Sequence, residues 1–417
     1  MTHIEQMIQD MCPNGVEFKK LGDLGVFENT GVDKKSHDDE QEVTLLNFMD
    51  VCRHKYIDAS IPSMVVTAPD RKIEQCNVLK DDIFITPSSE TIDEIGFAAV
   101  IMEDLPNVVY SYHIMRYRLK QPNTTTAKFI RYLFEAPVIR KQILKGAKGL
   151  TRFGLSKYQF ADIEIPLPPL EIQKKIVECL DKFSALAAEL QAELQMRRKQ
   201  YEYYRTQLLT PHSDCNSADN TDDCKWVFKA LGDITFLAKE RIPAEELSED
   251  NYVSVENLLS NKLGKTLSES VPVEGAFIKY IKNDILVGNI RPYLRKIWFA
   301  DTDGGTNGDV LTIRIKEAYK TQILPRFLFH VLSSEEFFFY DTNFSKGAKM
   351  PRGDKDKVMQ YPVVIPSLKE QERIVSILDK FEALTTSLSD GIPAEQALQQ
   401  KRYEYYRDKL LTFEKRP

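Results

Sequence analysis

The sequence has few of the features that mark a secreted or membrane protein. Its six cysteines are scattered and no C-x-x-C pair occurs, which argues against a zinc site and against a disulfide framework. No apolar run approaches the roughly 20 residues that a membrane span needs, and the first residues lack a basic-then-apolar signal pattern. We therefore expect a protein of the reducing cytoplasm that has no contact with membranes.

Common catalytic motifs are also missing. The sequence contains no nucleophile elbow, Walker loop, H-E-x-x-H motif or Rossmann glycine fingerprint. It contains neither the Asn/Asp-Pro-Pro-aromatic motif of amino-methyltransferases nor a glycine-rich loop placed for S-adenosylmethionine. The six histidines are isolated from one another, and none has acidic or cysteine neighbours in an arrangement that suggests a metal site or a catalytic triad. We therefore expect no catalytic residue, no metal site and no cofactor in this chain.

The charge distribution is uneven. The net charge of −6 is unusual for a protein that binds nucleic acid. Residues 211–225, however, form an acidic polar segment that resembles a solvated linker. No acidic residue lies between Glu135 and Asp162, and this stretch is rich in lysine and arginine. Such a local basic surface fits either a nucleic-acid contact or an ordinary solvated face.

The chain is an internal duplication, because matching blocks occur in the same order in both halves. The globular parts diverge outside the shared blocks, whereas the helical parts are nearly identical. This pattern predicts two divergent heads on two matched helices. The blocks are 17–24 and 227–234, 82–85 and 284–287, 111–120 and 307–316, 145–148 and 346–349, 165–186 and 364–384, and 200–210 and 402–412.

The expected fold class is mixed α/β, with two long helices that pack against each other as a coiled coil. In the first helix, apolar residues from Ile176 to Leu208 follow 4–3 spacing, and Pro168 and Pro169 precede it. The second copy repeats this seam from Ile374 to Leu388, with four extra residues around 390–393 that predict a helix stop and restart. The predicted boundaries are 1–165 and 226–363 for the heads, 166–210 and 364–412 for the helices, and 211–225 for the linker.

Two sets of residues are candidates for contacts with DNA. Each head contains a K-G-A-K block followed by an arginine, and lysines at such a turn suit phosphate oxygens; a helix-capping turn with solvated lysines is the alternative. Polar loops after the Asp-Ile strands are candidates for reading bases. The phosphate candidates are Lys145, Lys148, Arg152, Lys346, Lys349 and Arg352, and the base-reading candidates are Ser88, Ser89, Asn289, Arg291 and Arg295.

The two Y-E-Y-Y-R segments are candidates for a subunit interface. Tyr203 and Tyr405 lie off the helix seam, and exposed tyrosines on a packed helix pair suggest a surface that binds a partner. A tyrosine that lies along the coiled coil is the alternative. The residues predicted at the interface are Tyr201, Tyr203, Tyr204, Tyr403, Tyr405 and Tyr406.

The order of blocks resembles the specificity subunits of type I restriction–modification systems over essentially the whole chain. The most specific blocks are 168–183, 366–381 and the two Y-E-Y-Y-R…L-L-T ends. The resemblance implies that the heads are target recognition domains, each of which reads half of a bipartite, asymmetric site in double-stranded DNA. It also implies that the helices form an antiparallel coiled coil, which sets the spacing of the heads and docks two methyltransferase subunits. Those subunits methylate adenine with S-adenosylmethionine, and restriction subunits use ATP and Mg²⁺.

Three alternatives remain open at this point. The chain could serve a related system in which modification and cleavage share one subunit. It could be a coiled-coil adaptor that does not touch DNA, which a gel shift would reveal. A self-sufficient nuclease or methyltransferase would bind S-adenosylmethionine or a metal by itself.

Overall fold

The computed structural model describes residues 3–35, 37–121, 123–211, 226–386 and 391–417. The chain divides into unit 1, Met1–Ala188 with Leu398–Pro417, and unit 2, Glu189–Ala397. Both units combine sheets with helices, which confirms the predicted mixed α/β class. Apart from Pro211, the expected acidic linker lies outside the described residues.

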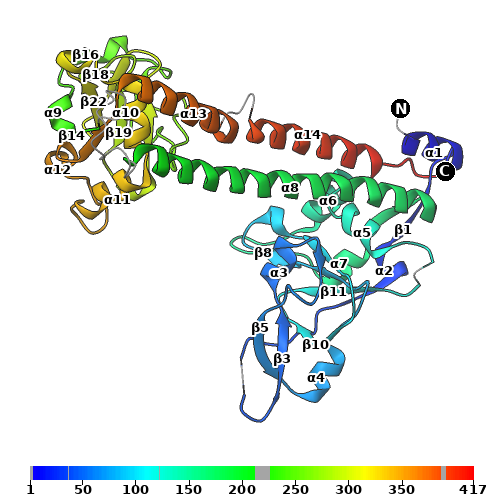
Figure 1. Cartoon of the computed structure of the whole chain (residues 1–417). Helices are drawn as coiled ribbons and strands as arrows, with labels where there is room; N and C mark the ends of the chain where they lie inside the picture. The colour runs from blue at the N-terminus through cyan, green and yellow to red at the C-terminus, as the bar shows by residue number, and fades with distance from the viewer. Residues whose placement is uncertain (1–2, 36, 122, 212–225, 387–390) are drawn as a thin grey trace. The chain divides into compact units, whose positions relative to one another are not determined.

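Unit 1 contains the first head. A five-stranded sheet has the order β2-β11-β7-β9-β4, and a four-stranded sheet has the order β5-β3-β10-β6, with α4 beside it (Figure 1). The helices are α1 (His3–Met11), α2 (Leu21–Leu24), α3 (Phe48–Arg53), α4 (Asp70–Gln75), α5 (Ala127–Leu133), α6 (Pro137–Gly146), α7 (Lys157–Ala161) and the first part of α8 (Leu170–Leu209). The strands are β1 (Glu17–Lys20), β2 (Gly25–Glu28), β3 (Gln41–Leu46), β4 (Tyr56–Ile57), β5 (Met64–Ala68), β6 (Asn77–Val78), β7 (Ile83–Ile85), β8 (Ser88–Ser89), β9 (Ala98–Ile101), β10 (Leu105–Tyr110), β11 (Met115–Leu119), β12 (Phe153–Gly154) and β13 (Glu164–Leu167).

Unit 2 contains the second head. Its main sheets have the orders β15-β22-β19-β20 and β16-β18-β21-β17. The helices are the second part of α8, α9 (Leu231–Ile234), α10 (Pro325–Leu332), α11 (Glu335–Asn343), α12 (Lys355–Met359), α13 (Leu368–Thr386) and the start of α14 (Ile392–Leu410). The strands are β14 (Val227–Ala230), β15 (Thr235–Leu237), β16 (Arg241–Pro243), β17 (Tyr252–Val253), β18 (Ala276–Tyr280), β19 (Ile285–Gly288), β20 (Ile297–Phe299), β21 (Gly304–Thr306), β22 (Val310–Ile315) and β23 (Pro362–Ile365).

The two heads repeat one framework in three dimensions, as the matching blocks predict. The order β2-β11-β7-β9 in head 1 corresponds to β15-β22-β19-β20 in head 2. An ion pair between a buried aspartate and a strand arginine recurs in the sheets of both heads. Arg118 Nε donates to Asp82 Oδ1 at 2.5 Å in head 1, and Arg314 Nη2 donates to Asp284 Oδ2 at 2.9 Å in head 2. The aspartates of the two Asp-Ile blocks therefore have a structural role, because each neutralises a strand arginine.

The long helical segments of the heads are each two helices. Residues 127–147 form α5 and α6, with Pro137 at the start of α6, where a missing backbone N–H has no cost. In head 2, α10 ends before Ser334, whose side chain caps α11 by accepting from the backbone N–H of Phe337 at 3.2 Å. The sequence pattern predicts helix in both regions correctly but does not reveal the breaks.

The helices of the two halves lie against each other in both units, and their direction is defined in unit 2. In unit 1 the rings of Phe183 on α8 and Tyr406 on α14 stack with centroids 5.5 Å apart. In unit 2 the rings of Tyr201 on α8 and Phe381 on α13 stack at 6.0 Å. Earlier on α8 within unit 2, Gln191 accepts from Gln396 on α14, so residue numbers rise along α8 while those of its neighbours fall, which is the antiparallel arrangement that the resemblance implies.

The predicted helical segments 166–210 and 364–412 each include strand residues before the helix, because β13 ends at Leu167 and β23 ends at Ile365. Helix α8 begins directly after Pro169 and ends at Leu209. Helix α14 restarts at Ile392, where the Gly391 carbonyl accepts from the N–H groups of Ala394 and Glu395. Leu388, the last residue of the predicted seam, and Asp390, at the start of the predicted helix break, lie outside the described residues.

Each head shares one hydrophobic core with the helices that it contacts. In unit 1 the buried residues Ile176 and Leu180 of α8 pack in the same cluster as Tyr117 and Phe160. In unit 2 Tyr201, Ile374 and Leu378 pack with Phe327 and the strands of the sheet. The helices are therefore part of each head's core rather than a detached spacer.

The C-terminal end of α14 belongs to unit 1, although it follows the second repeat in the sequence. Leu410 and Leu411 are buried in the core of unit 1. The backbone N–H of Val16 donates to the Glu414 carbonyl at 2.9 Å, and that of Arg416 donates to the Val16 carbonyl at 2.9 Å. The two ends of the chain thus meet in unit 1. Among the described residues, no helix combines the length and the apolar character that a membrane crossing requires.

Candidate nucleic-acid interface

The two candidate groups of head 1 lie side by side, although about 60 residues separate them in the sequence. Strand β8 pairs antiparallel with β12, so that Ser88 lies opposite Gly154. Arg152 Nε donates to Ser88 Oγ at 3.3 Å. The turn that leads into β12 is closed by reciprocal backbone hydrogen bonds between Lys148 and Gly154 at 3.1 and 3.0 Å. A basic hairpin turn and a polar loop therefore form one surface.

Head 2 builds the same surface from different residues. Its turn is closed by reciprocal backbone hydrogen bonds between Lys346 and Arg352 at 2.8 and 2.9 Å. The polar loop joins it, because the N–H of Arg291 donates to the Pro351 carbonyl at 2.7 Å and that of Gly353 donates to the Asn289 carbonyl at 3.0 Å. Both heads thus bring the predicted phosphate and base-reading groups together.

The equivalence between the two K-G-A-K blocks is wrong by three residues. Lys148 and Lys346 each open a turn that closes six residues later, so Lys148 rather than Lys145 corresponds to Lys346. Arg152 and Arg352 are consequently not equivalent, since Arg352 corresponds to Gly154. The two K-G-A-K blocks are identical in sequence but not in position, because hairpin closure, and not local identity, sets the register of such a turn.

The predicted phosphate contacts are exposed, but some of them are already paired with carboxylates. Lys145, Lys148, Arg152 and Lys349 are exposed. Lys346 Nζ lies 2.6 Å from Asp354 Oδ2, and Arg352 Nη2 lies 3.1 Å from Asp309 Oδ1. Surface pairs of this kind contribute little to stability and can exchange for a phosphate oxygen.

The structure argues against a contact with bases for two of the predicted residues. Ser89 is buried and donates to Glu94 Oε2 at 2.5 Å. Asn289 is 4% exposed. Its side chain and that of Asp341 lie so close to Gly353 that a Cβ at this glycine would collide with both. Burial raises the pKa of the Asp341 carboxyl to about 6. Both side chains belong to the interior of their heads: Ser89 bonds to Glu94, whereas Asn289 Oδ1 and the Asp341 oxygens are buried without a hydrogen-bond partner among the described residues.

The remaining base-reading candidates differ in accessibility. Ser88 is half-buried, and Arg291 is exposed. Arg295 Nη2 forms an ion pair with Glu335 Oε2 at 2.9 Å. Sequence reasoning missed Tyr293, which is 51% exposed between the two arginines; the R-P-Y-L-R pattern, with its proline-initiated turn, was an available signal.

The corresponding loops of the two heads carry opposite charge. The loop of head 1 contains Glu90 and Asp93, both exposed. The loop of head 2 contains Arg291, Arg295 and Lys296. Carboxylates accept hydrogen bonds from cytosine N4, whereas arginine donates to guanine O6 and N7. One framework therefore presents two different hydrogen-bonding surfaces.

The six tyrosines predicted at a subunit interface divide into two groups. Tyr201 is 6% exposed in the core of unit 2, and Tyr403 donates to Glu135 in unit 1 while its ring lies 4.7 Å from Lys55 Nζ. Tyr406 stacks on Phe183. These three tyrosines pack the helices against each other or against the heads. Burial of Lys55 beside Tyr403 lowers the pKa of Lys55 to about 8. Tyr203, Tyr204 and Tyr405 remain exposed, at 62%, 39% and 58%.

One group of side chains in unit 2 has the composition of a metal site but already contains a cation. His330, Asp379 and Glu382 lie within 4.8 Å of one another. Arg326 donates to Asp379 at 2.8 Å and to Glu382 at 2.7 Å. Burial lowers the pKa of His330 to about 4, so the ring is neutral near pH 7. Since Arg326 balances the carboxylates, we interpret the group as the polar contact between α10 and α13.

The fold and this surface define a class of protein: two heads of one topology, each with a basic turn beside a variable polar loop, packed on antiparallel helices. The profile of the type I restriction modification DNA specificity domain matches residues 13–196 and 224–396. The chain therefore belongs to the type I restriction–modification specificity family.

Two relatives illustrate the similarity in sequence. The specificity subunit of the type I restriction enzyme EcoR124I/EcoR124II from Escherichia coli is 31% identical over 279 residues, which is 63% of this chain and 65% of that protein. The putative type I restriction enzyme specificity subunit S.HindORF215P from Haemophilus influenzae is 34% identical over 283 residues, 64% of this chain and 68% of that protein. The chain thus spans slightly less than two thirds of the first relative's length.

Solved structures resemble the whole chain. The S subunit of a type I restriction–modification system from M. genitalium superposes with a TM-score of 0.52 at 14% identity, covering 95% of this chain and 96% of that one. A chain from a structure on complex assembly and conformational transition of the type I R-M system gives 0.55 at 14% identity, with coverage of 96% and 98%. At this level of identity the similarity concerns the fold alone.

Proposed function

We propose that this chain is the sequence-reading subunit of a type I restriction–modification complex and carries no catalytic residue of its own. The heads, residues 1–165 and 226–363, each read one half of a bipartite, asymmetric DNA site. The helices, residues 166–210 and 364–412, set the spacing of the heads and dock two methyltransferase subunits. Those subunits methylate adenine with S-adenosylmethionine, and restriction subunits cleave DNA with ATP and Mg²⁺. The cytoplasm is the expected compartment.

One observation carries this proposal: both heads join a basic turn to a polar loop on the same strands, yet the loops differ in sequence and in charge. Backbone phosphates are alike at every site, so a basic turn suits both half-sites. Bases differ, so the reading loops must differ. An adaptor that does not bind DNA would need neither the basic turns nor the differing loops, so it does not account for their combination.

The proposal is tested with the full chain and a type I methyltransferase subunit on a randomised DNA library. We expect sequencing of the products to show methylated adenines in one bipartite, asymmetric motif, and the methyltransferase subunit alone to show none. No binding in gel shifts, together with no enriched motif, would favour the adaptor that does not touch DNA. S-adenosylmethionine bound by the isolated chain would favour a self-sufficient enzyme. Cleavage by the methylating subunit itself would identify a system with a fused partner.

We expect Lys148→Ala and Lys349→Ala to weaken DNA binding equally for cognate and mutated sites. Each lysine lies at an exposed turn, and each lost phosphate contact flattens the dependence of log K on log salt by about 0.9. Fluorescence anisotropy at several salt concentrations measures this slope. Lys175→Ala, an exposed position on α8, is the matched control and should leave the slope unchanged. A change in the preferred bases would show that these lysines are not phosphate contacts.

A further inference from the structure

The reading loop of head 2 has an unusual backbone. Arg291 and Arg295, at φ 53° and 54°, flank the short helical turn Pro292–Leu294. Asn261 and Lys262 are also left-handed, at φ 56° and 64°. L-residues other than glycine are disfavoured there, so four such residues persist only if their surroundings over-determine them.

The two left-handed segments are hydrogen-bonded to each other. The N–H of Asn261 donates to the Leu294 carbonyl, and the N–H of Lys262 donates to the Arg295 carbonyl, both at 2.9 Å. On its other side the loop is joined to the basic turn through Arg291 and Pro351. The backbone of the loop is therefore held from two sides.

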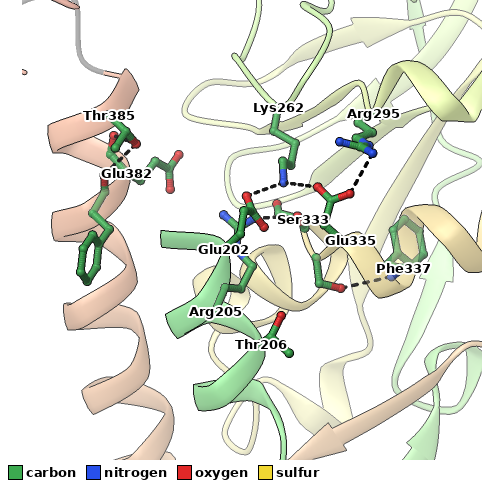
Figure 2. Close-up of polar contacts among 12 residues, drawn as sticks. Glu202, Arg205, Thr206, Lys262, Arg295, Ser333, Glu335, Phe337, Glu382 and Thr385 are labelled. Carbon is green, nitrogen blue, oxygen red and sulfur yellow. Dashed lines mark hydrogen bonds and ion pairs between the residues drawn. The ribbon is translucent and has the colours of Figure 1, made fainter. Parts of the chain in front are cut away.

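A chain of ion pairs links this loop to helix α8, as Figure 2 shows. Arg295 Nη2 lies 2.9 Å from Glu335 Oε2, and Lys262 Nζ lies 3.0 Å from Glu335 Oε1. Lys262 Nζ also lies 2.7 Å from Glu202 Oε1 of α8. Glu202 in turn accepts from Arg205 Nη1 at 3.0 Å, and the same nitrogen donates to the Ser333 carbonyl at 2.8 Å.

These pairs are well placed to act as a unit. The Lys262 side chain is only 13% exposed, so water screens its two ion pairs less than the Arg295–Glu335 pair, whose side chains are 42% and 40% exposed. Each carboxylate bridges two cations, so the removal of one member leaves its neighbours unbalanced.

We propose that Glu202, Lys262, Arg295 and Glu335 form a clamp that positions the reading loop of head 2 on helix α8. Arg295 is then a positioning residue, and the exposed Arg291 is the side chain that contacts a base. This inference rests on the proposed DNA-reading function of the loop. The clamp gives a reason for the disfavoured, left-handed backbone conformation of Arg295, because its guanidinium pairs with Glu335.

The clamp is tested with Lys262→Met, Glu335→Gln, Arg295→Met and Arg295→Lys in the full chain, by selection from a randomised DNA library and by anisotropy. We expect the first three to weaken cognate binding about tenfold and to relax base preference across the whole half-site read by head 2. The salt slope should not change, because no phosphate contact is lost. The double variant with Arg295→Met and Glu335→Gln should bind DNA no more weakly than either single variant, because both changes break the same pair. Arg295→Lys should retain most of the binding that Arg295→Met loses.

Several outcomes would overturn the clamp. Loss of preference at one base pair in Arg295→Lys, with wild-type behaviour of Glu335→Gln, would show that Arg295 reads a base directly. Wild-type behaviour of all four variants would refute the clamp and leave the proposed function intact, whereas failure of the unaltered chain to select any sequence would refute the function. Thermal unfolding and the half-site of head 1 serve as controls. A general loss of fold would affect both half-sites and would count against a positioning role.

Discussion

Inserting two residues into both paired helices, after Leu190 in α8 and after Ala397 in α14, is expected to abolish sequence-specific DNA binding. A matched insertion of four residues is expected to keep both half-site sequences and to lengthen the unread spacer. The two positions lie near antiparallel partners, since Gln396 Nε2 donates to Gln191 Oε1 at 2.9 Å. Helix α8 is continuous through Leu190.

Helix geometry explains the difference between the two insertions. Each residue adds about 1.5 Å and turns the helix by about 100°, so two residues turn it by about 200° and four by about one full turn plus 40°. After the smaller insertion, the faces that carry Phe183 and Tyr201 point in nearly opposite directions relative to their normal register. The larger insertion moves the following residues by about 6 Å, which is roughly two base pairs of DNA at 3.4 Å each.

Sequencing of methylated sites from a library with variable spacers measures this effect. A four-residue insertion in segment 211–225 is the control and should leave the motif unchanged. If the variant with four extra helical residues still recovers the original spacer, helix length does not set the distance. The docked methyltransferase subunits would then be the best candidates for that role.

Tyr201→Ala is expected to destabilise unit 2 by about 3 kcal/mol, because a buried aromatic side chain leaves a cavity when it is truncated. Tyr201 is 6% exposed and stacks on Phe381. Its ring centroid lies 4.2 Å from Arg205 Cζ. For a unit of this size we expect the unfolding midpoint to fall by roughly 10 °C. Differential scanning calorimetry measures this change.

Tyr203→Ala is the matched comparison, two residues further along the same helix. Tyr203 is 62% exposed, so its loss should change the unfolding midpoint very little. We propose that Tyr203 and its counterpart Tyr405 contact the methyltransferase subunits. Tyr203→Ala combined with Tyr405→Ala should weaken co-purification with a methyltransferase subunit while DNA binding by the chain alone is retained. Unchanged assembly would show that the partner binds elsewhere.

Much of the architecture can be predicted from the sequence, because it depends on short-range patterns. Apolar runs bounded by turn residues predict the strands, and 4–3 spacing between a proline pair and Thr210 predicts α8. Gly391 and Pro393 predict the restart of α14. The repeated Asp-Ile blocks reveal the duplication, and the shared ion pairs of Asp82 and Asp284 show why these blocks match.

The accessibility of side chains on the candidate surface can be predicted from the sequence only in part. The exposed lysines of the two turns could be predicted, because basic residues in a stretch without acids remain solvated. The burial of Ser89 and Asn289 could not be predicted, since it depends on Glu94 and on the approach of Gly353. The same holds for Arg295, whose partner Glu335 lies 40 residues further along the chain.

The sequence by itself determined that two divergent α/β heads alternate with two matched helices, because repeats and hydrophobic periods are properties of neighbouring residues. Only the tertiary structure decided which parts pack together. It placed the end of α14 in the core of unit 1 and the Glu202 segment of α8 against head 2. It also set the register of the basic turns. The reason is physical: a buried side chain or a charged group takes the partner that the folded chain brings within a few ångströms, and sequence separation does not limit that choice.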